Sequence, residues 1–384
     1  MSVTAAQGFT AAGVTCGLKS TGARDLTLVV NTGPEYSAAN VFTANRAKAN
    51  PVLWSEKVAA DGIVRAIVLN SGGANCYTGV QGFQTTHATA EHVAAAVGVD
   101  AGDVLVCSTG LIGDQLDLSK LTAGVDAAVA ELSTEGGGHA AEGIMTTDTR
   151  PKQATVISPA GWTIGGMAKG AGMLAPGLAT MLVVITTDAR VEADVLDRAL
   201  RTATRVTFDR LDSDGCMSTN DTVSLLASGA SGVVPDTAEF QTALTDLCRD
   251  LVLQLQADAE GAAHDIAIEV TGAVTEDDAV EVARAVSRSN LFKAAIFGGD
   301  PNWGRVLAAI GTTSAPFDPY GVDVSMNGIR VCRAGEPDAS RDLVDLSPRN
   351  VHVLIELHTG EASATLWTND LTHDYVHENS AYSS

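Results

Sequence analysis

The sequence predicts an α/β protein in which helices and sheets are stacked in α+β layers. Apolar residues recur at every second position in some segments and at every third or fourth position in others, and the two kinds of segment alternate along the 384 residues. Hydrophobic residues make up 45% of the chain, which is enough for a large core. Because only 4% of the residues are aromatic and 38 are glycines, we expect an aliphatic core with close backbone contacts.

The first half of the chain contains two predicted strands, each followed by a glycine-containing turn. Gly62–Asn70 is a largely apolar run typical of a buried strand, and it leads into the turn sequence SGGAN. Val104–Cys107 is a shorter strand that leads into Ser108-Thr109-Gly110. Between the two strands, the spacing of apolar residues over about Phe83–Val97 predicts a helix that stops at Gly98.

The second half alternates amphipathic helices with strands. Ala193–Thr207 predicts one helix, and Asp236–Glu260 predicts a longer one that opens with an Asp236…Glu239 capping pair and ends before Gly261. Three segments follow: a half-buried strand with Ile266, Ile268 and Val270 on one face, a helix from Thr275 to about Asn290, and a mainly β region from Val322 in which Val351, Val353, Ile355 and Leu357 face one side.

Composition limits the classes of partner. The formal net charge is −22, which argues against a nucleic-acid interface or a surface for anionic membranes. The start of the chain lacks the basic and apolar regions of a signal peptide, and the longest apolar stretch, Ala171–Ile185, is interrupted and too short to span a bilayer. The six cysteines show neither C-x-x-C nor zinc spacing, so we expect free thiols. These features predict a cytoplasmic protein.

The common motifs of metal, phosphate and serine-hydrolase sites are missing from the sequence. It contains no G-x-x-x-x-G-K-[ST], no H-E-x-x-H, and no G-x-S-x-G between a strand and a helix. Asp212–Gly215 differs from a calcium loop in the position of its glycine, and an exposed polar face explains His373 and His377 better than a metal site does. We therefore expect neither a metal nor a bound cofactor.

The most irregular interior stretch is Lys169–Thr180, which is apolar enough for burial but contains Pro176 and Gly177. Thr180 ends this stretch and begins an apolar, strand-like run. The residues alone leave two interpretations open. Thr180 could be an ordinary β-branched strand starter, or the chain could cut its own Ala179–Thr180 bond. The new α-amine, with an unperturbed pKa of about 7.7–8.0, would then be a base beside the Thr180 hydroxyl.

Eight segments, spread from the first fifth of the chain to its last residue, carry a resemblance to a known family. They are NSGGAN (70–75), STGLIG (108–113), GIMTTDTRPK (143–152), GMAKGAGMLAPGLATML (166–182), STNDTV (218–223), DAEG (258–261), DPNWGRVLAAIG (300–311) and ENSAYSS (378–384). With these segments in register, the chain resembles the ornithine acetyltransferases, also called glutamate N-acetyltransferases, of the cyclic arginine pathway.

The resemblance implies self-processing. Members of the family resemble N-terminal-nucleophile enzymes in chemistry but have their own α/β topology, and they cleave themselves before the threonine of an A-T-M-L motif, which is Thr180 here. Cleavage would give an N-terminal chain of residues 1–179 and a C-terminal chain of residues 180–384. The resemblance further implies that the two chains stay interwoven in an α2β2 assembly.

The implied reaction is a ping-pong acetyl transfer. The Thr180 hydroxyl would attack the acetyl carbonyl of N2-acetyl-L-ornithine while the Thr180 amine takes the proton, and L-glutamate would then collect the acetyl group. The resemblance assigns the oxyanion hole to the Thr109 hydroxyl and the Gly110 N–H. Without the resemblance, Ser108-Thr109-Gly110 would be interpreted as an ordinary turn.

Substrate-binding positions carry over by the same resemblance to Thr146, Lys169, Thr180, Glu260, Asn379 and Ser384. Both substrates carry a carboxylate, for which Lys169 is a suitable point charge, and Glu260 could pair with the side-chain ammonium of ornithine. From the residues alone, Lys169 would be interpreted as a solvated surface residue and Glu260 as a helix-end carboxylate. Ser384 stands where many members of the family end in threonine.

Three hypotheses about function follow. The first is the acetyltransferase, with a bifunctional variant that also uses acetyl-CoA as a co-substrate, and the resemblance favours it. The second is an N-terminal-nucleophile amidohydrolase or aminopeptidase of related fold, which would pass its acyl group to water. The third is a binding protein in which Thr180 never becomes a chain terminus. The sequence does not decide on acetyl-CoA use, feedback inhibition, primary or secondary metabolism, or the exact oligomer.

Overall fold

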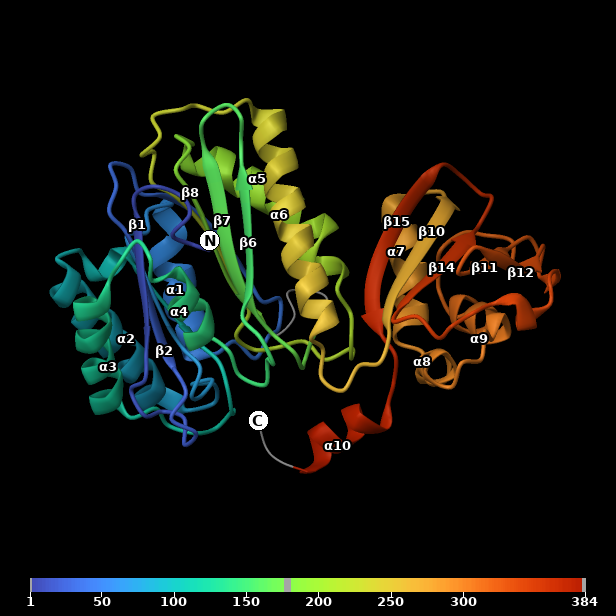
Figure 1. Ribbon diagram of the computed structural model, residues 1–384, viewed down its shortest axis with the longest axis horizontal. Coiled ribbons are helices and arrows are strands. Elements are labelled where there is room, and N and C mark those ends of the chain that lie inside the picture. The colour runs from blue at the N-terminus through green and yellow to red at the C-terminus, as the bar shows by residue number, and fades with distance from the viewer. Residues whose placement is uncertain (1, 176–180, 382–384) are drawn as a thin grey trace.

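Two β-sheets that pack face to face form the centre of the larger part of the molecule (Figure 1). The computed structural model describes residues 2–175 and 181–381. In this part of the chain, the first sheet has four strands in the order β1-β2-β4-β5, with the bounds β1 (Phe9–Val14), β2 (Leu26–Asn31), β4 (Ala66–Asn70) and β5 (Val104–Ser108). β4 and β5 run parallel, with Asn70 opposite Ser108. The turns that follow these two strands therefore lie side by side.

The second sheet combines strands from both sides of residue 180. In the described part of the chain its five strands, in the order β3-β9-β8-β7-β6, are β3 (Ser37–Phe42), β9 (Thr222–Ala227), β8 (Leu182–Thr187), β7 (Thr163–Lys169) and β6 (Lys152–Ile157). β7 pairs antiparallel with β8, so that Lys169 lies opposite Leu182. Segments 1–179 and 180–384 thus share one hydrogen-bonded sheet. Cleavage between them stays a prediction, because Ala179 and Thr180 lie outside the described residues.

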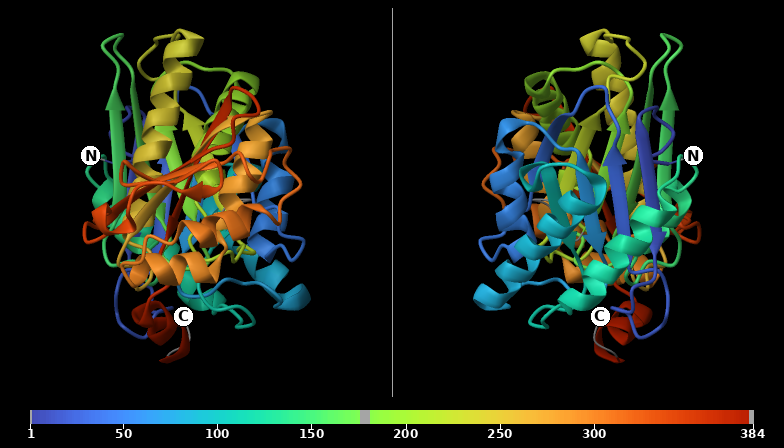
Figure 2. Two further views of the ribbon diagram at one scale, coloured as in Figure 1. Left: turned by 90° about the vertical axis from the view of Figure 1, so that its right-hand side faces the viewer. Right: turned by 90° about the vertical axis from the view of Figure 1, so that its left-hand side faces the viewer.

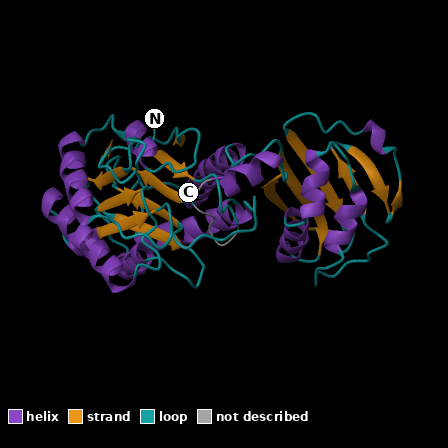
Figure 3. Cartoon of the chain, turned by 90° about the horizontal axis from the view of Figure 1, so that it is seen from below, coloured by secondary structure: helices purple, strands orange, loops and turns teal. Residues whose placement is uncertain are grey.

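Helices cover the outer faces of both sheets and complete four layers (Figures 1 and 3). Leu69 and Leu105 of the first sheet meet Leu182 and Val184 of the second in the core between the sheets. The helices on the first sheet are α1 (Asn50–Val58), α2 (Gly79–Val97) and α3 (Leu118–Glu131), with α4 (Gly137–Gly143) beside β1 and β2; α5 (Ala193–Val206) and α6 (Thr237–Ala257) cover the second sheet. This arrangement confirms the predicted α/β layers and positions the loops at the ends of β5, β7 and β8.

The C-terminal part forms a lobe with a core of its own (Figure 2, left). Its sheet has the order β13-β12-β11-β14-β10-β15, with the bounds β10 (Asp265–Ala273), β11 (Asp323–Met326), β12 (Ile329–Arg333), β13 (Glu336–Pro337), β14 (Asn350–Glu356) and β15 (Ala362–Asn369). The helices packed on this sheet are α7 (Glu276–Ser287), α8 (Asn290–Phe297) and α9 (Trp303–Ile310). The predicted apolar faces of β10 and β14 are buried in this core, so the alternation seen in the sequence is confirmed.

Several predicted boundaries differ from the structure. α6 begins at Thr237 with the Asp236 carboxylate accepting from the N–H groups of Ala238 and Glu239, as predicted, but it ends at Ala257. The predicted helix 275–290 ends at Ser287, because Ser289 caps a new helix. The region from Val322 is mainly β, as predicted, and α10 (His373–Ala381) follows its last strand, β15. Short 3-10 turns occupy Ala59–Asp61, Ala101–Asp103, Phe208–Arg210 and Arg341–Leu343.

The described residues can be compared with the expected absence of a membrane span and with the expected free thiols. Among the described residues, no helix combines the length and the apolar character that a membrane span needs. All six cysteines lie in the described part of the chain, and each is a free thiol. Cys76, Cys107, Cys248 and Cys332 are buried, where they pack as small apolar side chains.

The backbones of α4 and β1 approach each other closely at Gly13, and a substitution there tests the predicted close backbone contacts. A Cβ atom added at Gly13 of β1 would lie 1.9 Å from the carbonyl oxygen of His139 in α4. Gly13→Ala should therefore lower the free energy of unfolding by about 3 kcal/mol, the upper end of the range for overpacked sites, because neither backbone can move freely. Denaturant unfolding measures this change.

Gly138→Ala in α4 is the matched control. A Cβ atom at Gly138 would meet no heavy atom within 4 Å, and alanine favours helices over glycine by about 0.5–1 kcal/mol. We expect this variant to be as stable as the unsubstituted protein or slightly more stable. Equal stability of the Gly13→Ala and Gly138→Ala variants would contradict the close approach of the two backbones.

Candidate active site

The turn after β5 interlocks with the turn after β4. The Thr109 N–H donates to the Asn70 carbonyl and the Thr109 carbonyl accepts from the Gly73 N–H, each at 2.9 Å. Gly110 has φ +126°, and a Cβ atom there would lie 2.8 Å from the Gly73 nitrogen, so only glycine fits. The parallel register of β4 and β5 thus fixes the backbone at Thr109 and Gly110, the two residues predicted to form an oxyanion hole.

Lys169, the last residue of β7, reaches this turn from the second sheet. Its side chain is buried, and its Nζ donates to Thr109 Oγ1 at 3.3 Å. Burial lowers the pKa of Lys169, whereas the neighbouring Asp148 carboxylate favours its charged form. The interpretation of Lys169 as a solvated surface residue is therefore wrong. Its role in binding a substrate carboxylate stays a prediction.

A buried network of charges lies beside Lys169. Lys152 Nζ donates to Asp148 Oδ1 at 2.5 Å and to Asp258 Oδ2 at 2.6 Å. Burial alone would raise the pKa of Asp148, but the ammonium groups of Lys169 and Lys152 outweigh it and hold this pKa at about 2. Asp148 also accepts the N–H groups of Thr146 (2.9 Å) and Gly170 (2.7 Å). The ionised carboxylate therefore links Thr146 to the backbone after Lys169.

The segment after Lys169 passes directly against Glu260. The Glu260 N–H donates to the Ala171 carbonyl at 3.0 Å, and a Cβ atom at Gly172 would lie 2.6 Å from Glu260 Oε1. Asn379 of α10 donates through Nδ2 to Glu260 Oε2 at 3.0 Å. Glu260 lies beyond the end of α6 rather than in its last turn, so the helix-end interpretation is wrong. Its proposed pairing with a substrate ammonium stays a prediction.

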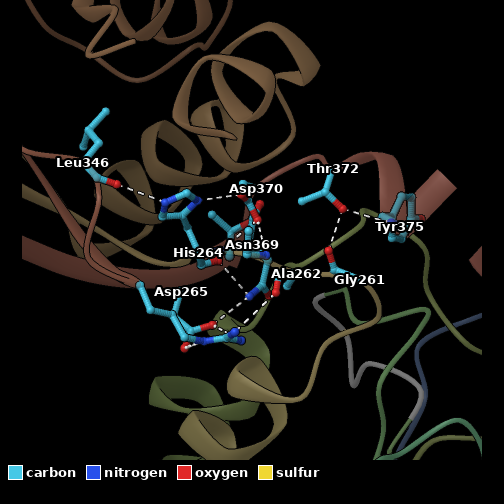
Figure 4. A network of polar contacts seen from close by, with 12 residues as sticks. Gly261, Ala262, His264, Asp265, Leu346, Asn369, Asp370, Thr372 and Tyr375 are labelled. Carbon is cyan, nitrogen blue, oxygen red and sulfur yellow. Dashed lines mark hydrogen bonds and ion pairs between the residues drawn. The ribbon is translucent and has the colours of Figure 1, made fainter. Parts of the chain in front are cut away.

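A polar network fixes α10 next to Glu260 (Figure 4). His264 Nδ1 contacts Asp370 Oδ2 at 2.6 Å, and Thr372 Oγ1 donates to the Gly261 carbonyl at 2.5 Å. Thr372 also accepts the Tyr375 N–H at 2.9 Å, in the first turn of α10. Because Gly261 directly follows Glu260, these bonds set the position of α10, and with it Asn379, relative to the Glu260 carboxylate.

Two cavities open around these residues. Gly110, Thr146 and Asp148 line one of about 780 Å³. Glu260 and Glu378 line another of about 530 Å³, and Thr147 borders both cavities. Both volumes lie within the range of small-molecule sites. Among the described residues, no group of three or more His, Cys, Asp or Glu side chains could hold a metal ion.

Comparison with known proteins gives the family. A model of the ArgJ family matches residues 10–384. The chain is 63% identical to the arginine biosynthesis bifunctional protein ArgJ of Streptomyces coelicolor and 61% identical to the protein of that name from Thermobifida fusca, in both cases over 384 residues that cover all of each chain. The chain belongs to the ArgJ family.

Two solved structures are similar to parts of this ArgJ-family chain. Ornithine acetyltransferase from Mycobacterium tuberculosis, complexed with ornithine, is 54% identical, with a TM-score of 0.45, over 47% of this chain and 96% of that chain. The arginine biosynthesis bifunctional protein argJ from Bacillus halodurans is 36% identical, with a TM-score of 0.49, over 51% of this chain and 97% of that chain.

The structure of this ArgJ-family chain brings the described site residues together in pairs. Lys169 contacts Thr109, Glu260 contacts Asn379, and Gly110 and Thr146 line the same cavity. Thr180 and Ser384 lie outside the described residues. Each described pair joins segments that are far apart in the sequence. The bond from the Glu260 N–H to the Ala171 carbonyl and Thr147, which borders both cavities, connect the pairs with one another.

Sequence reasoning missed the buried charges that support the site. The segments GIMTTDTRPK and DAEG, which carry the family resemblance, contain Asp148, Lys152 and Asp258. No role was predicted for these three residues from the sequence. The sequence offers only a weak signal, because charged residues at 148, 150 and 152 are typical of an exposed turn, and Arg150 is indeed exposed while Asp148 and Lys152 are buried. Only the three-dimensional contacts show that Lys152 joins the two aspartates.

The lowered pKa of Asp148 predicts a pH dependence of stability. Its pKa falls from the ordinary 3.8 to about 2 in the folded protein, so the ionised form favours folding above about pH 4, and this contribution is lost as the pH falls to about 2. The shift corresponds to roughly 2 kcal/mol. Asp148→Asn should be less stable than the unsubstituted protein at neutral pH, and the difference should shrink between about pH 4 and pH 2.

Asp246→Asn supplies the control, because Asp246 is an exposed partner of Arg249 on α6. Exposed ion pairs contribute about 0–1 kcal/mol, so this variant should differ little from the unsubstituted protein at any pH. Denaturant unfolding of all three proteins across the acid range gives the comparison. A stability difference for Asp148→Asn that does not change with pH would show that the carboxylate is not ionised in the folded state.

Proposed function

We propose that this chain transfers the acetyl group of N2-acetyl-L-ornithine to L-glutamate through an acetyl-Thr180 intermediate, in arginine biosynthesis. Thr180 would become the first residue of the C-terminal chain when the Ala179–Thr180 bond is cut. Its hydroxyl would attack the acetyl carbonyl and its amine would take the proton. Ornithine would leave before glutamate binds, since both amino acids use the same nucleophile.

The relatives support the reaction class. The Streptomyces coelicolor relative, identical at 63% of positions, carries the name arginine biosynthesis bifunctional protein. The Mycobacterium tuberculosis relative, identical at 54% of matched positions, is an ornithine acetyltransferase with ornithine bound. Because that relative is named a bifunctional protein, we propose acetyl-CoA as a second acetyl donor for this chain.

The contact between Lys169 and Thr109 is the observation that carries the mechanism. Because Lys169 Nζ donates to Thr109 Oγ1, the hydroxyl hydrogen of Thr109 is free to donate to another acceptor. A buried ammonium beside the hydroxyl makes it a stronger donor, and low-dielectric surroundings strengthen the bond to a developing negative charge. The Thr109 hydroxyl and the Gly110 N–H are thus suited to an oxyanion.

The proposed substrate positions are consistent with the charges around the two cavities. The cavity of about 530 Å³ has a net negative lining, which suits the side-chain ammonium of ornithine: its carboxylates outnumber its single arginine, Arg349, and include Glu260, Asp374 and Glu378. Burial raises the pKa of Glu378, and the nearby Glu260 carboxylate adds to the shift. Lys169 has donors left for a substrate carboxylate after it binds Thr109. Glutamate has a carboxylate where ornithine has its ammonium, so other groups must bind that end.

We also propose that the cleaved chains remain assembled in the cytoplasm as two N-terminal and two C-terminal chains. The shared sheet supports the association of the two cleaved segments, because residues 164–169 of β7 on one side of residue 180 pair with residues 182–187 of β8 on the other. Every backbone bond between these strands would persist after the Ala179–Thr180 bond is broken. The substrates, rather than nucleic acid or a membrane, would then be the further partners.

Intact-mass spectrometry tests the intermediate. We expect purified protein to consist of two chains that break between Ala179 and Thr180, whereas Thr180→Ala should remain one chain of 39.4 kDa. With N2-acetyl-L-ornithine alone, the C-terminal chain should gain one acetyl group while ornithine appears in a stoichiometric burst. L-Glutamate should then remove the acetyl group and restore turnover.

Other outcomes of that experiment support the other hypotheses. Steady release of ornithine without glutamate, and without an acetyl adduct, would indicate an amidohydrolase that passes the acyl group to water. An active protein that remains a single chain would contradict Thr180 as an N-terminal nucleophile. A single chain without any turnover would agree with a binding protein.

Thr109 variants test the oxyanion hole. Thr109→Val should lower kcat by about 100- to 1,000-fold with a much smaller change in KM, because the hydroxyl acts mainly on the transition state. Thr109→Ser keeps the hydroxyl and should retain most of the activity, which makes it the matched control. Steady-state kinetics on fully cleaved protein separates the two constants. A raised KM with unchanged kcat for Thr109→Val would reject this role.

A further inference from the structure

Asp221 holds the residue that directly follows Thr180 in the sequence. The Met181 N–H donates to Asp221 Oδ1 at 3.0 Å, and the Met181 carbonyl accepts the Thr222 N–H at 3.2 Å. The ladder between β8 and β9 begins one residue later, where Leu182 lies opposite Thr222. The Met181 N–H is therefore bound by the side chain of Asp221, and the Met181 carbonyl is bound by the backbone of the next residue, Thr222.

Asn220, the residue before Asp221, holds the turn that carries Thr109. Its Nδ2 donates to the Ser108 carbonyl at 2.8 Å and to the Ala74 carbonyl at 2.6 Å. Its Oδ1 accepts the Thr219 hydroxyl at 2.6 Å, which fixes the orientation of the amide group. Asn220 and Asp221 together therefore connect the residue before Thr109 to the residue after Thr180.

The Asp221 carboxyl group is buried. It is 1% exposed, and both the Met181 N–H and the Ser218 side chain act on it as hydrogen-bond partners. Burial raises its pKa well above the usual value, although hydrogen bonds from the Met181 N–H and the Ser218 side chain and the charge of Lys169 oppose this shift. A carboxyl group can accept the Met181 N–H in either protonation state, so the hydrogen bond does not depend on the charge of Asp221.

We propose that Asp221 is a positioning residue, which with Asn220 holds the Met181 N–H at a set place relative to the turn that carries the Thr109 and Gly110 donors. It acts through the hydrogen bond to Met181 and not by passing a proton to the substrate. The inference rests on the proposed role of Thr180 as the nucleophile. A misplacement of about 1 Å at a reacting group can cost about 100-fold in rate, so loss of this bond should affect kcat.

Two substitutions of Asp221 distinguish a role as hydrogen-bond acceptor for Met181 from a role as an acid that donates a proton. Asp221→Asn keeps an acceptor for the Met181 N–H, and we expect its kcat to stay within about threefold of the unsubstituted protein. Asp221→Leu has a similar size but no acceptor. It should cleave slowly at Ala179–Thr180 and, once cleaved, show a kcat lower by about 10- to 100-fold with KM changed by less than about threefold.

Asp188→Leu is the matched control. Asp188 is a buried aspartate just past the other end of β8, where it accepts the N–H groups of Thr163 (2.7 Å) and Gln7 (3.0 Å). Its loss should lower the melting temperature as Asp221→Leu does, without lowering the kcat of the folded fraction. If Asp221→Leu does not fold, Asp221→Ser, which is smaller and lacks the carboxyl group, gives the same test.

Each outcome either supports or overturns the positioning role. If folded Asp221→Leu or Asp221→Ser is processed and turns over as the unsubstituted protein does, Asp221 does not position the nucleophile. If Asp221→Asn is as slow as Asp221→Leu, the acid proton itself is used and Asp221 is not merely a positioning residue. Failure of the Thr180 proposal is distinguishable, because the unsubstituted protein would then show neither two chains nor an acetyl adduct.

Discussion

The pairing of β7 with β8 is the constraint on which the rest of the site depends. Lys169 lies opposite Leu182, so the chain between these residues must leave the sheet and return to the neighbouring strand. Gly170 and Ala171 bind Asp148 and Glu260 at one end, and Met181 binds Asp221 at the other. The two ends of this segment are thus held by separate contacts.

Buried charges give this region its electrostatic character. Lys152 and Lys169 are buried together with Asp148 and Asp258, in a protein whose formal net charge is −22. Burying ions is costly unless each has an opposite charge and hydrogen bonds, and Lys152 meets this condition by contacting both aspartates. The local arrangement of charge, not the net charge, therefore sets the field at the Thr109 hydroxyl.

The C-terminal lobe contributes to the site through the connections at its edge. The bonds of His264 with Asp370 and of Thr372 with Gly261 lie where the first strand of the lobe starts and its last strand ends (Figure 4). They direct α10 back toward the four-layer body, where Asn379 meets Glu260. A lobe with its own core can thus supply a helix to a site built mainly on another part of the chain.

The sequence by itself determined the layered α/β class, because the spacing of apolar residues that distinguishes strands from helices is a local property of the chain. The structure has the predicted strands β4, β5, β10 and β14 and the predicted helices α2, α5 and α6. It also identified the turn at Thr109 and the segment from Lys169 as candidates, since rare glycine-rich segments carry the family resemblance. Helix ends near Ala257 and Ser287 were misplaced, because side-chain caps and tertiary contacts decide where a helix stops. Only the tertiary structure decided three features of the site. They are the burial of Lys169, the ion pairs of Lys152 with both Asp148 and Asp258, and the hydrogen bond between Asp221 and Met181. Each depends on the pairing of strands distant in the sequence, and no local pattern of residues specifies which distant backbone a charged side chain will meet.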